Sequence, residues 1–170
     1  MVYIVLGATH PNEVREHGEA YRLSLEILAR RNKVDKSVIF YNQFVDLDNL
    51  KEFIGAADLY VTPYLNEARI TSGTLAYTFG SGKAVVSTPY WHAAELLADD
   101  RGVLVPFADA PAIAREVIGL LRDDTRVLMN CLRHLCVSGR DRMHRPVRPE
   151  PIRYQSALPG TLGAWMAWNK

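Results

Sequence analysis

The chain has 170 residues, 48% of them hydrophobic, and its 20 basic and 19 acidic side chains give a formal net charge of +1. This size and composition are typical of one globular domain with its own core, and the near-neutral charge argues against nucleic acid or an anionic membrane as partner. No apolar run reaches the roughly 18 residues of a membrane span. The first residue leads directly into a strand-like run without a basic region or cleavage site, so we expect a cytoplasmic location.

The two cysteines give no sign of a disulfide or a metal centre. Cys131 and Cys136 lie five residues apart in a segment that resembles a helix or a tail, and no second Cys or His pair has the spacing of a zinc site. We therefore expect neither a metal nor a cofactor in this protein.

Short apolar runs alternate with amphipathic patterns along the first part of the chain. The helical patterns include Ala20, Leu23 and Ile27 on one face, and Asp46 and Asp109 are placed to cap later helices. This alternation predicts an α/β, Rossmann-like domain of three layers, with helices covering a mainly parallel sheet of about five strands. The runs that predict these strands are residues 2–6, 38–41, 59–61, 84–87 and 103–105.

The pattern changes after residue 124. Residues 125–136 are compatible with a helix, whereas residues 137–170 are first rich in arginine and proline, then in small and aromatic residues, without an apolar period. We therefore divide the chain into a domain of residues 1–124 and a segment of residues 125–170. For the end of this segment the sequence leaves open a disordered extension, a docking arm or a non-native reading frame.

The most informative stretch runs from Pro63 to Pro89, where a polar loop leads into a helix that opens at Thr-Ser-Gly-Thr, residues 71–74. A helix start exposes unpaired N–H groups and a partial positive charge, so anions bind there. The hydroxyls of Thr71, Ser72 and Thr74 add donors, and a glycine between them allows close approach of a ligand. Taken alone, the same residues favour a simple helix cap over a ligand site.

Four loops are expected to meet at one edge of the sheet. Because crossovers between parallel strands are right-handed, the loops at residues 7–11, 42–46, 64–72 and 87–92 all emerge at the carboxyl ends of the strands. Open α/β sheets bind their ligands at this edge. The shared location is the best internal argument for a binding site.

Two common nucleotide-binding motifs are absent. Residues 80–83, Gly-Ser-Gly-Lys, are similar to part of a P-loop, but Tyr77 stands in place of its first glycine, Ala84 in place of its Ser or Thr, and a strand follows. No Gly-x-Gly-x-x-Gly follows the first strand. His10 and His92 have no carboxylate neighbour in sequence, and we expect loop or cap roles for them more than catalysis.

Four segments, taken in order, resemble the donor-binding, C-terminal half of a GT-B glycosyltransferase of group 1, the retaining enzymes related to glycogen and sucrose synthases. They are VYIVLGATHP at 2–11, DKSVIFYNQFVDLDNLKEFIGAADLYVTPY at 35–64, TSGTLAYTFGSGKAVVSTPYWHAAELL at 71–97 and RGVLVPFADAPAIAREVIGLL at 101–121. The resemblance covers roughly residues 1–125. It is specific for the superfamily and says little about the substrate.

The resemblance implies roles for particular residues. Gly73 and Thr74, with the amides of Thr71 and Ser72, fall where the family grips the diphosphate of a nucleotide-sugar. Tyr77 is placed to offer a hydroxyl to the ribose. The nucleoside base is held, largely by backbone, at positions that correspond to Asn42, Gln43 and Phe44. Glu95 falls on the glutamate of the family's gg..E segment, within residues 71–97.

The sequence also departs from the family. The family's two glutamates, which have seven residues between them, would map onto Arg69 and Tyr77, and neither residue is acidic. Glu67 lies two residues before the first position, so the catalytic residues stay unassigned, with Arg69, Glu67 and His10 as candidates. The family's domain also begins one strand and one helix earlier, in a piece that carries an arginine and a lysine for the leaving phosphate.

The function that the resemblance implies is transfer of a sugar from a nucleoside diphosphate to an acceptor hydroxyl, with retention, in polysaccharide, glycolipid or glycoconjugate synthesis. The expected partners are a UDP-, GDP- or ADP-sugar donor and an N-terminal, acceptor-binding domain that this sequence lacks. Any peripheral membrane contact is expected through the rest of the enzyme. By itself the chain is expected to bind the donor without turnover.

Two alternatives stay open. A nucleotide-sugar epimerase or hydrolase of GT-B type would carry its acid and base carboxylates in the other half. A non-catalytic, flavodoxin-like signalling module would need an acidic pocket after the first strand, where this chain has Gly7, Ala8 and Thr9.

Overall fold

The computed structural model of the protein describes residues 1–9, 11–138 and 162–167, and the surroundings of their side chains except at 13, 134–138 and 162–167. The elements are β1 (Val2–Leu6), α1 (Pro11–His17), α2 (Ala20–Arg31), η1 (Asp35–Ser37), β2 (Val38–Tyr41), α3 (Leu47–Ala56), β3 (Leu59–Thr62), α4 (Gly73–Gly80), β4 (Ala84–Ser87), α5 (Trp91–Leu96), β5 (Val103–Leu104), α6 (Ala110–Arg122), α7 (Asp124–Ser138) and β6 (Leu162–Ala167).

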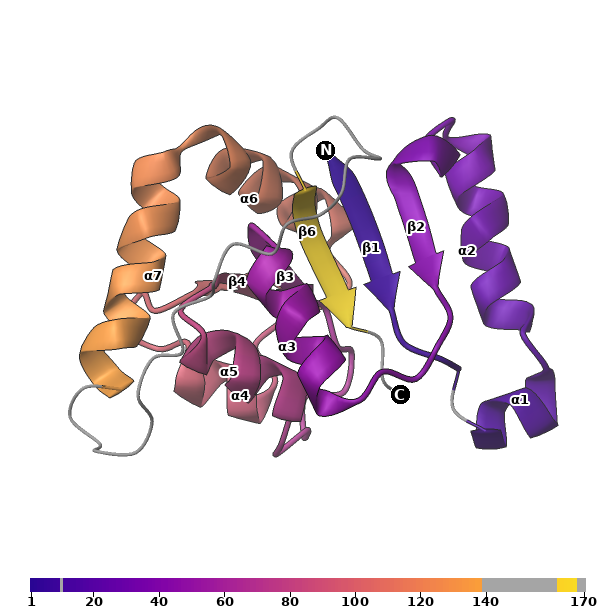
Figure 1. Ribbon diagram of the computed structural model, residues 1–170, viewed down its shortest axis with the longest axis horizontal. Helices are drawn as coiled ribbons and strands as arrows, with labels where there is room; N and C mark the ends of the chain where they lie inside the picture. Colours follow the sequence, from indigo (N-terminus) through magenta and orange to yellow (C-terminus); the bar gives the residue numbers. More distant parts are fainter. Residues whose placement is uncertain (10, 139–161, 168–170) are drawn as a thin grey trace.

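The described strands form one sheet in the order β2-β1-β6-β3-β4-β5, and every pair in it is parallel. The predicted parallel α/β fold is therefore confirmed, with one strand beyond the expected number. Because the strands run the same way, their carboxyl ends lie at a common edge, at the bottom of Figure 1. The loops that precede α1, α3, α4 and α5 leave the sheet at this edge.

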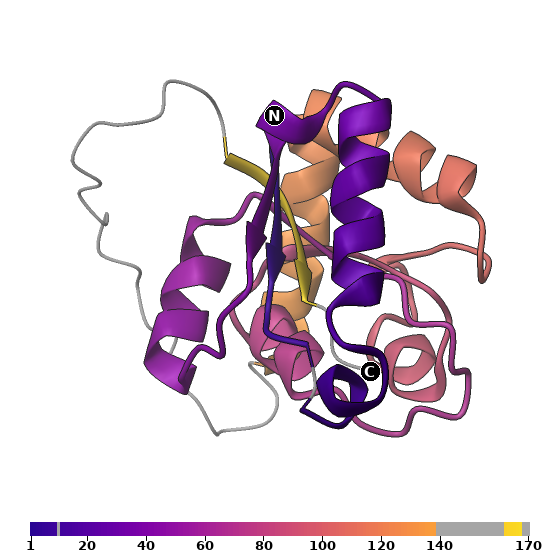
Figure 2. The ribbon, with the colours of Figure 1, turned by 90° about the vertical axis from the view of Figure 1, so that its right-hand side faces the viewer.

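The alternation of side chains along the central strands separates two cores. Successive residues of a strand point to opposite faces; thus Leu59 and Val61 belong to one core and Tyr60 to the other. The core around Tyr60 includes buried residues of α4 and α5 with partly buried residues of α3, whereas the core around Leu59 includes residues of α6 and α7. Figure 2 shows the sheet edge-on, with α3 on one side and α2, α6 and α7 on the other.

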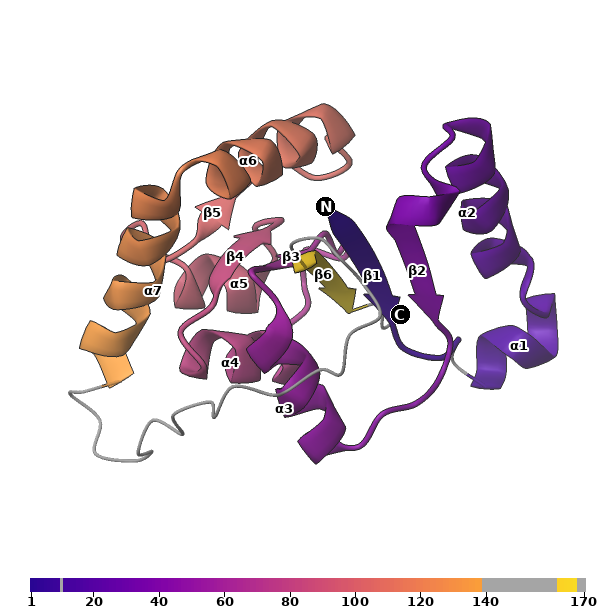
Figure 3. The same ribbon diagram turned by 45° about the horizontal axis from the view of Figure 1, so that its top comes forward.

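Strand β6 lies between β1 and β3 in the sheet, although both of these strands are far from it in sequence. Its Trp165 is in register with Ile4 of β1 and with Tyr60 of β3, and Met166 is in register with Val5 and Val61. Among the described strands, β1 and β3 are both hydrogen-bonded to β6 and not to each other. Figure 3 shows β6 between them. The sequence did not predict this strand, because its six residues lack the β-branched side chains that marked the other strands.

Helix α7 continues the body of the domain past residue 124. It follows α6 after Asp123 alone, and Val127 and Cys131 pack against the core that contains Leu120. Cys131 is a free cysteine, and burial raises the pKa of its thiol. The division of the chain at residue 124 stays a prediction.

The position of β6 predicts that shortening the chain will lower its stability. Each ladder hydrogen bond contributes about 0.5–1.5 kcal/mol net, so a chain that ends at residue 161 should lose at least ~2 kcal/mol of unfolding free energy. Urea denaturation measures this loss, and hydrogen exchange should quicken at β1 and β3. A chain that ends at residue 167 is the control; equal midpoints for the two shortened chains would contradict the structural role of β6.

Candidate functional site

The start of α4 lies at the carboxyl edge of the sheet and presents free backbone donors. Ser72 is the N-cap, with extended backbone, and its side chain accepts a hydrogen bond of 3.3 Å from the Leu75 amide. Within the part of the chain that the structure describes, the amides of Gly73 and Thr74 have no hydrogen-bond partner. A methyl group placed on Gly73 would meet no atom within 4 Å. The first turn of the helix therefore has an exposed glycine and two N–H groups without a partner among the described residues.

A histidine side chain accepts a hydrogen bond from the amide of the residue just before this helix. The Ser72 N–H donates to Nδ1 of His92 over 2.9 Å, and Ser72 is almost completely buried. Of the amides predicted to bind phosphate, that of Ser72 is thus already engaged within the protein. The assignment of Thr71, Ser72, Gly73 and Thr74 to phosphate binding stays a prediction, and Thr71 is exposed beside them.

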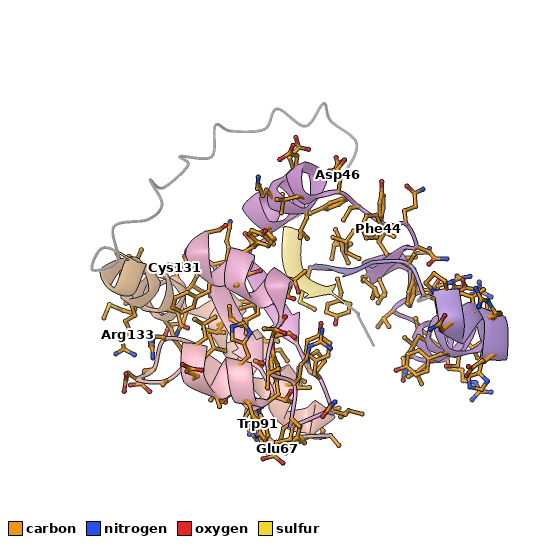
Figure 4. All side chains as sticks on the ribbon, turned by 90° about the horizontal axis from the view of Figure 1, so that it is seen from below. Phe44, Asp46, Glu67, Trp91, Cys131 and Arg133 are labelled. Atoms are coloured by element: carbon orange, nitrogen blue, oxygen red, sulfur yellow. The ribbon has the colours of Figure 1, made fainter. Side chains whose placement is uncertain are left out.

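The loop between β3 and α4 is fastened to the first turn of α5. The Trp91 amide donates to the carbonyl of Glu67 over 3.0 Å, and the His92 amide donates to the carbonyl of Arg69 over 3.3 Å. These bonds cap α5, whose N-cap residue, Tyr90, makes no capping bond through its side chain. Figure 4 looks onto this edge of the sheet and shows Glu67 and Trp91 close together. Glu67 thus contributes its backbone here, while its side chain is in water.

Aromatic contacts hold the side chain of Arg69. Its guanidinium carbon lies 4.0 Å from the centroid of the Tyr64 ring, in a cation–π contact. The Tyr64 ring in turn packs edge-on against Tyr90, with centroids 5.2 Å apart. Because Tyr90 is fully buried, this series of contacts anchors the arginine to the core. Its orientation is set by packing as well as by charge.

Several hydroxyl groups are buried under this loop. The side-chain oxygens of Tyr60, Thr62, Tyr64 and Tyr90 make no hydrogen bond of good geometry among the described residues. The Tyr60 hydroxyl lies near Thr74, the Tyr90 hydroxyl lies near Ser72, and burial raises the pKa of both tyrosines. These groups therefore stay protonated at neutral pH and form a neutral, polar floor beneath the start of α4.

A second part of the edge, at the ends of β1 and β2, forms a largely apolar pocket. Val5, Tyr21, Leu25 and Phe40 supply apolar walls, and Asn42 stands among the polar lining residues; Gly7, Ala8, Thr9 and Arg22 complete the lining.

An acidic side chain lies beside this pocket. The carboxylate of Glu19 accepts hydrogen bonds from the Thr9 hydroxyl over 2.8 Å and from Nε of Arg22 over 3.0 Å. These two residues hold the pKa of the Glu19 carboxyl below its ordinary value. The rim therefore combines a fixed anion, a cation and neutral hydrogen-bonding groups.

A comparison of the sequence with known protein families assigns the chain to one of them. The family model of group 1 glycosyl transferases matches residues 6–123. The chain belongs to the group 1 glycosyltransferases. This family membership confirms the resemblance found in the sequence and supports a role in glycosyl transfer.

A solved structure shows the same fold as this glycosyltransferase domain. It is the C-terminal domain of a group 1 family glycosyl transferase, LpcC, from Francisella tularensis, with a TM-score of 0.69 and 19% sequence identity. The match covers 82% of this chain and 69% of the other. The expected C-terminal half of a GT-B fold is therefore confirmed. A comparison with curated proteins gives no match.

The remaining predicted site residues of the glycosyltransferase domain are spread along the same edge. Gln43 and Phe44 follow Asn42 in the loop after β2, and the Phe44 side chain is 90% exposed. Tyr77 is exposed on α4, four residues after Gly73 and thus on the same helix face. Figure 4 places Phe44 far from Glu67. His10 lies outside the described residues.

Two other kinds of feature are absent from the described ranges. No group of three or more His, Cys, Asp or Glu side chains there could hold a metal ion. The helices of the same ranges include none that is both long and apolar enough to cross a membrane.

Sequence reasoning missed the contact of His92 and the pocket at β1 and β2. His92 lies 20 residues from Ser72, and no local pattern links a histidine at one helix start to an amide at another. Tyr21 and Arg22 looked like ordinary positions of an amphipathic helix. The one usable signal was that the loops after β1 and β2 share an edge.

The buried hydroxyl of Tyr90 gives a direct test of this description. Tyr90→Phe keeps the ring and removes a hydroxyl that makes no well-formed hydrogen bond among the described residues, so the unfolding free energy should stay the same or rise by up to ~1 kcal/mol. Tyr90→Leu is the matched variant that loses the ring contacts and should destabilise the domain. Urea denaturation separates the cases, and a clear loss of stability in Tyr90→Phe would show that the hydroxyl has a partner.

Proposed function

We propose that this glycosyltransferase domain binds the nucleoside diphosphate of a sugar donor along the carboxyl edge of its sheet, with the phosphates at the start of α4. The observation that carries the proposal is a helix start at which the Gly73 and Thr74 amides have no hydrogen-bond partner among the described residues and a side chain added at Gly73 would meet open space. A helix end stabilises an anion by about 0.3–1 kcal/mol when exposed and up to ~2 kcal/mol when partly buried. The two amides add direct hydrogen bonds to that field.

The nucleoside is assigned to the side of the edge that contains β1 and β2. The loop of Asn42, Gln43 and Phe44 supplies backbone groups for the base, and the adjoining pocket offers apolar walls with a polar rim. Tyr77 is assigned to the ribose. Helical side chains lean toward the N-terminus of their helix, so the exposed Tyr77 leans toward the turn that contains Gly73.

The reaction assigned to the complete enzyme is hexosyl transfer with retention. The acceptor oxygen forms a bond to the anomeric carbon and loses its proton, while the bond from that carbon to the diphosphate oxygen breaks. Negative charge grows on the leaving diphosphate, so fixed donors at Gly73 and Thr74 stabilise the transition state more than the ground state. This role requires no metal.

Other groups of the reaction are proposed to come from the loop before α4 and from outside this domain. Arg69 and Glu67 are candidates for contact with the sugar or the phosphates, since their loop adjoins the start of α4. An acceptor-binding half and further cationic groups for the diphosphate are proposed to come from outside this domain. Donor binding without turnover is therefore the activity proposed for the chain by itself.

Substitution at Gly73 should separate anion binding from folding. A side chain at this position meets no protein atom within 4 Å, and an acidic residue in the first turn is favourable to a helix. Gly73→Asp should therefore fold normally yet bind UDP, GDP or ADP at least ~10-fold more weakly, since two like charges about 4 Å apart repel by ~1–4 kcal/mol. Isothermal titration calorimetry measures the binding.

The matched control is Gly73→Asn, which has the same size without the charge and should lose less affinity. The uncharged nucleosides should bind all three proteins equally. Equal affinity of Gly73→Asp and wild type for the diphosphate would move the phosphates away from α4. Absence of heat from all three diphosphates at millimolar concentration, with folded protein, would refute donor binding by this domain.

A further inference from the structure

The hydrogen bond between Ser72 and His92 links the two helix starts at the ligand-binding edge. His92 lies in the first turn of α5, and its amide and that of Trp91 are fastened to the carbonyls of Arg69 and Glu67. Its ring returns toward the same loop and accepts the Ser72 N–H over 2.9 Å. The loop before α4 is therefore held by the backbone and by the side chain of one residue.

This contact fixes the residue that begins α4. The amide of Ser72 is held by His92, and its side-chain oxygen is held by the amide of Leu75. With both groups of Ser72 engaged, its backbone orientation is set, and the following amides, at Gly73 and Thr74, are left without a partner among the described residues. The direction of those two donors thus depends on an acceptor at one position, Nδ1 of the imidazole.

We propose that His92 is a positioning residue for the diphosphate of the donor. It acts through Ser72, without contact to the donor, by holding the Ser72 amide so that the Gly73 and Thr74 amides point at the phosphates. This inference rests on the proposed donor binding at α4. Only an unprotonated Nδ1 accepts a hydrogen bond, so the neutral ring that carries its proton on Nε2 performs this role.

Three substitutions distinguish the acceptor from the bulk of the ring. In His92→Asn, the side-chain oxygen occupies nearly the place of Nδ1, whereas in His92→Gln it corresponds to Nε2; His92→Ala has no acceptor. The affinity of the diphosphate that wild type binds best should stay within about twofold in His92→Asn, provided the amide oxygen takes over the hydrogen bond, and fall about tenfold, ~1.4 kcal/mol, in the other two. Thermal unfolding of each full-length variant checks that it is folded.

A measurement without ligand tests the contact itself. In full-length protein labelled with ¹⁵N, a coupling across the hydrogen bond should join the Ser72 amide nitrogen to Nδ1 of His92, and the imidazole shifts should show Nδ1 unprotonated. A folded spectrum without this coupling would overturn the proposal.

The outcomes separate this inference from the proposed function. If wild type binds none of UDP, GDP and ADP, donor binding fails and the role of His92 falls with it. If wild type binds a diphosphate and His92→Ala binds it equally well, only the role of His92 is refuted. Equal weakening in His92→Asn and His92→Gln would show that the ring packs without orienting the amides, and this result also refutes the proposal.

Discussion

The site depends on a reciprocal set of hydrogen bonds between the loop before α4 and the first turn of α5. The α5 amides donate to the carbonyls of Glu67 and Arg69, and the His92 ring accepts the Ser72 N–H. Each segment thereby satisfies groups that the other would leave unpaired at its end. Two helix starts are consequently held side by side at one edge of the sheet. This arrangement keeps a cationic side chain in a fixed relation to two amides that have no partner among the described residues.

The sheet beneath this arrangement supplies its rigidity. Residues of β3 and β4 are buried on both faces, as expected for central parallel strands, and the core around Tyr60 and Tyr90 lies directly under the loop. The hydroxyls of these tyrosines are unpartnered among the described residues, which costs stability. The protein retains polar groups below the start of α4, where an apolar floor would be more stable.

Each single electrostatic contact of the site contributes only a modest free energy. A helix end contributes about 0.3–2 kcal/mol, and Arg69 is shared with the Tyr64 ring. A second group of polar side chains, around Glu19, lies at the other end of the edge. Polar groups at both ends of the edge fit the elongated donor that we propose better than a compact ligand.

The sequence by itself determined the parallel fold, the family and the place where α4 begins. Strands of β-branched residues and caps such as Asp46 and Asp109 are encoded within a few neighbouring positions; the structure shows both caps accepting the expected amide. Ser72 was likewise readable as a helix start, although its amide was assigned to a ligand and is held by His92.

Only the tertiary structure decided the contacts between distant segments. No periodic sequence pattern marks these contacts, because each depends on where separate elements meet in space. They are the insertion of β6 between β1 and β3, the hydrogen bond from Ser72 to His92 and the packing of Arg69 on Tyr64. Local sequence fixes the backbone conformation of a helix start through hydrogen bonds between residues a few positions apart. Which of its amides stay free is settled by the neighbours that the folded chain brings to it.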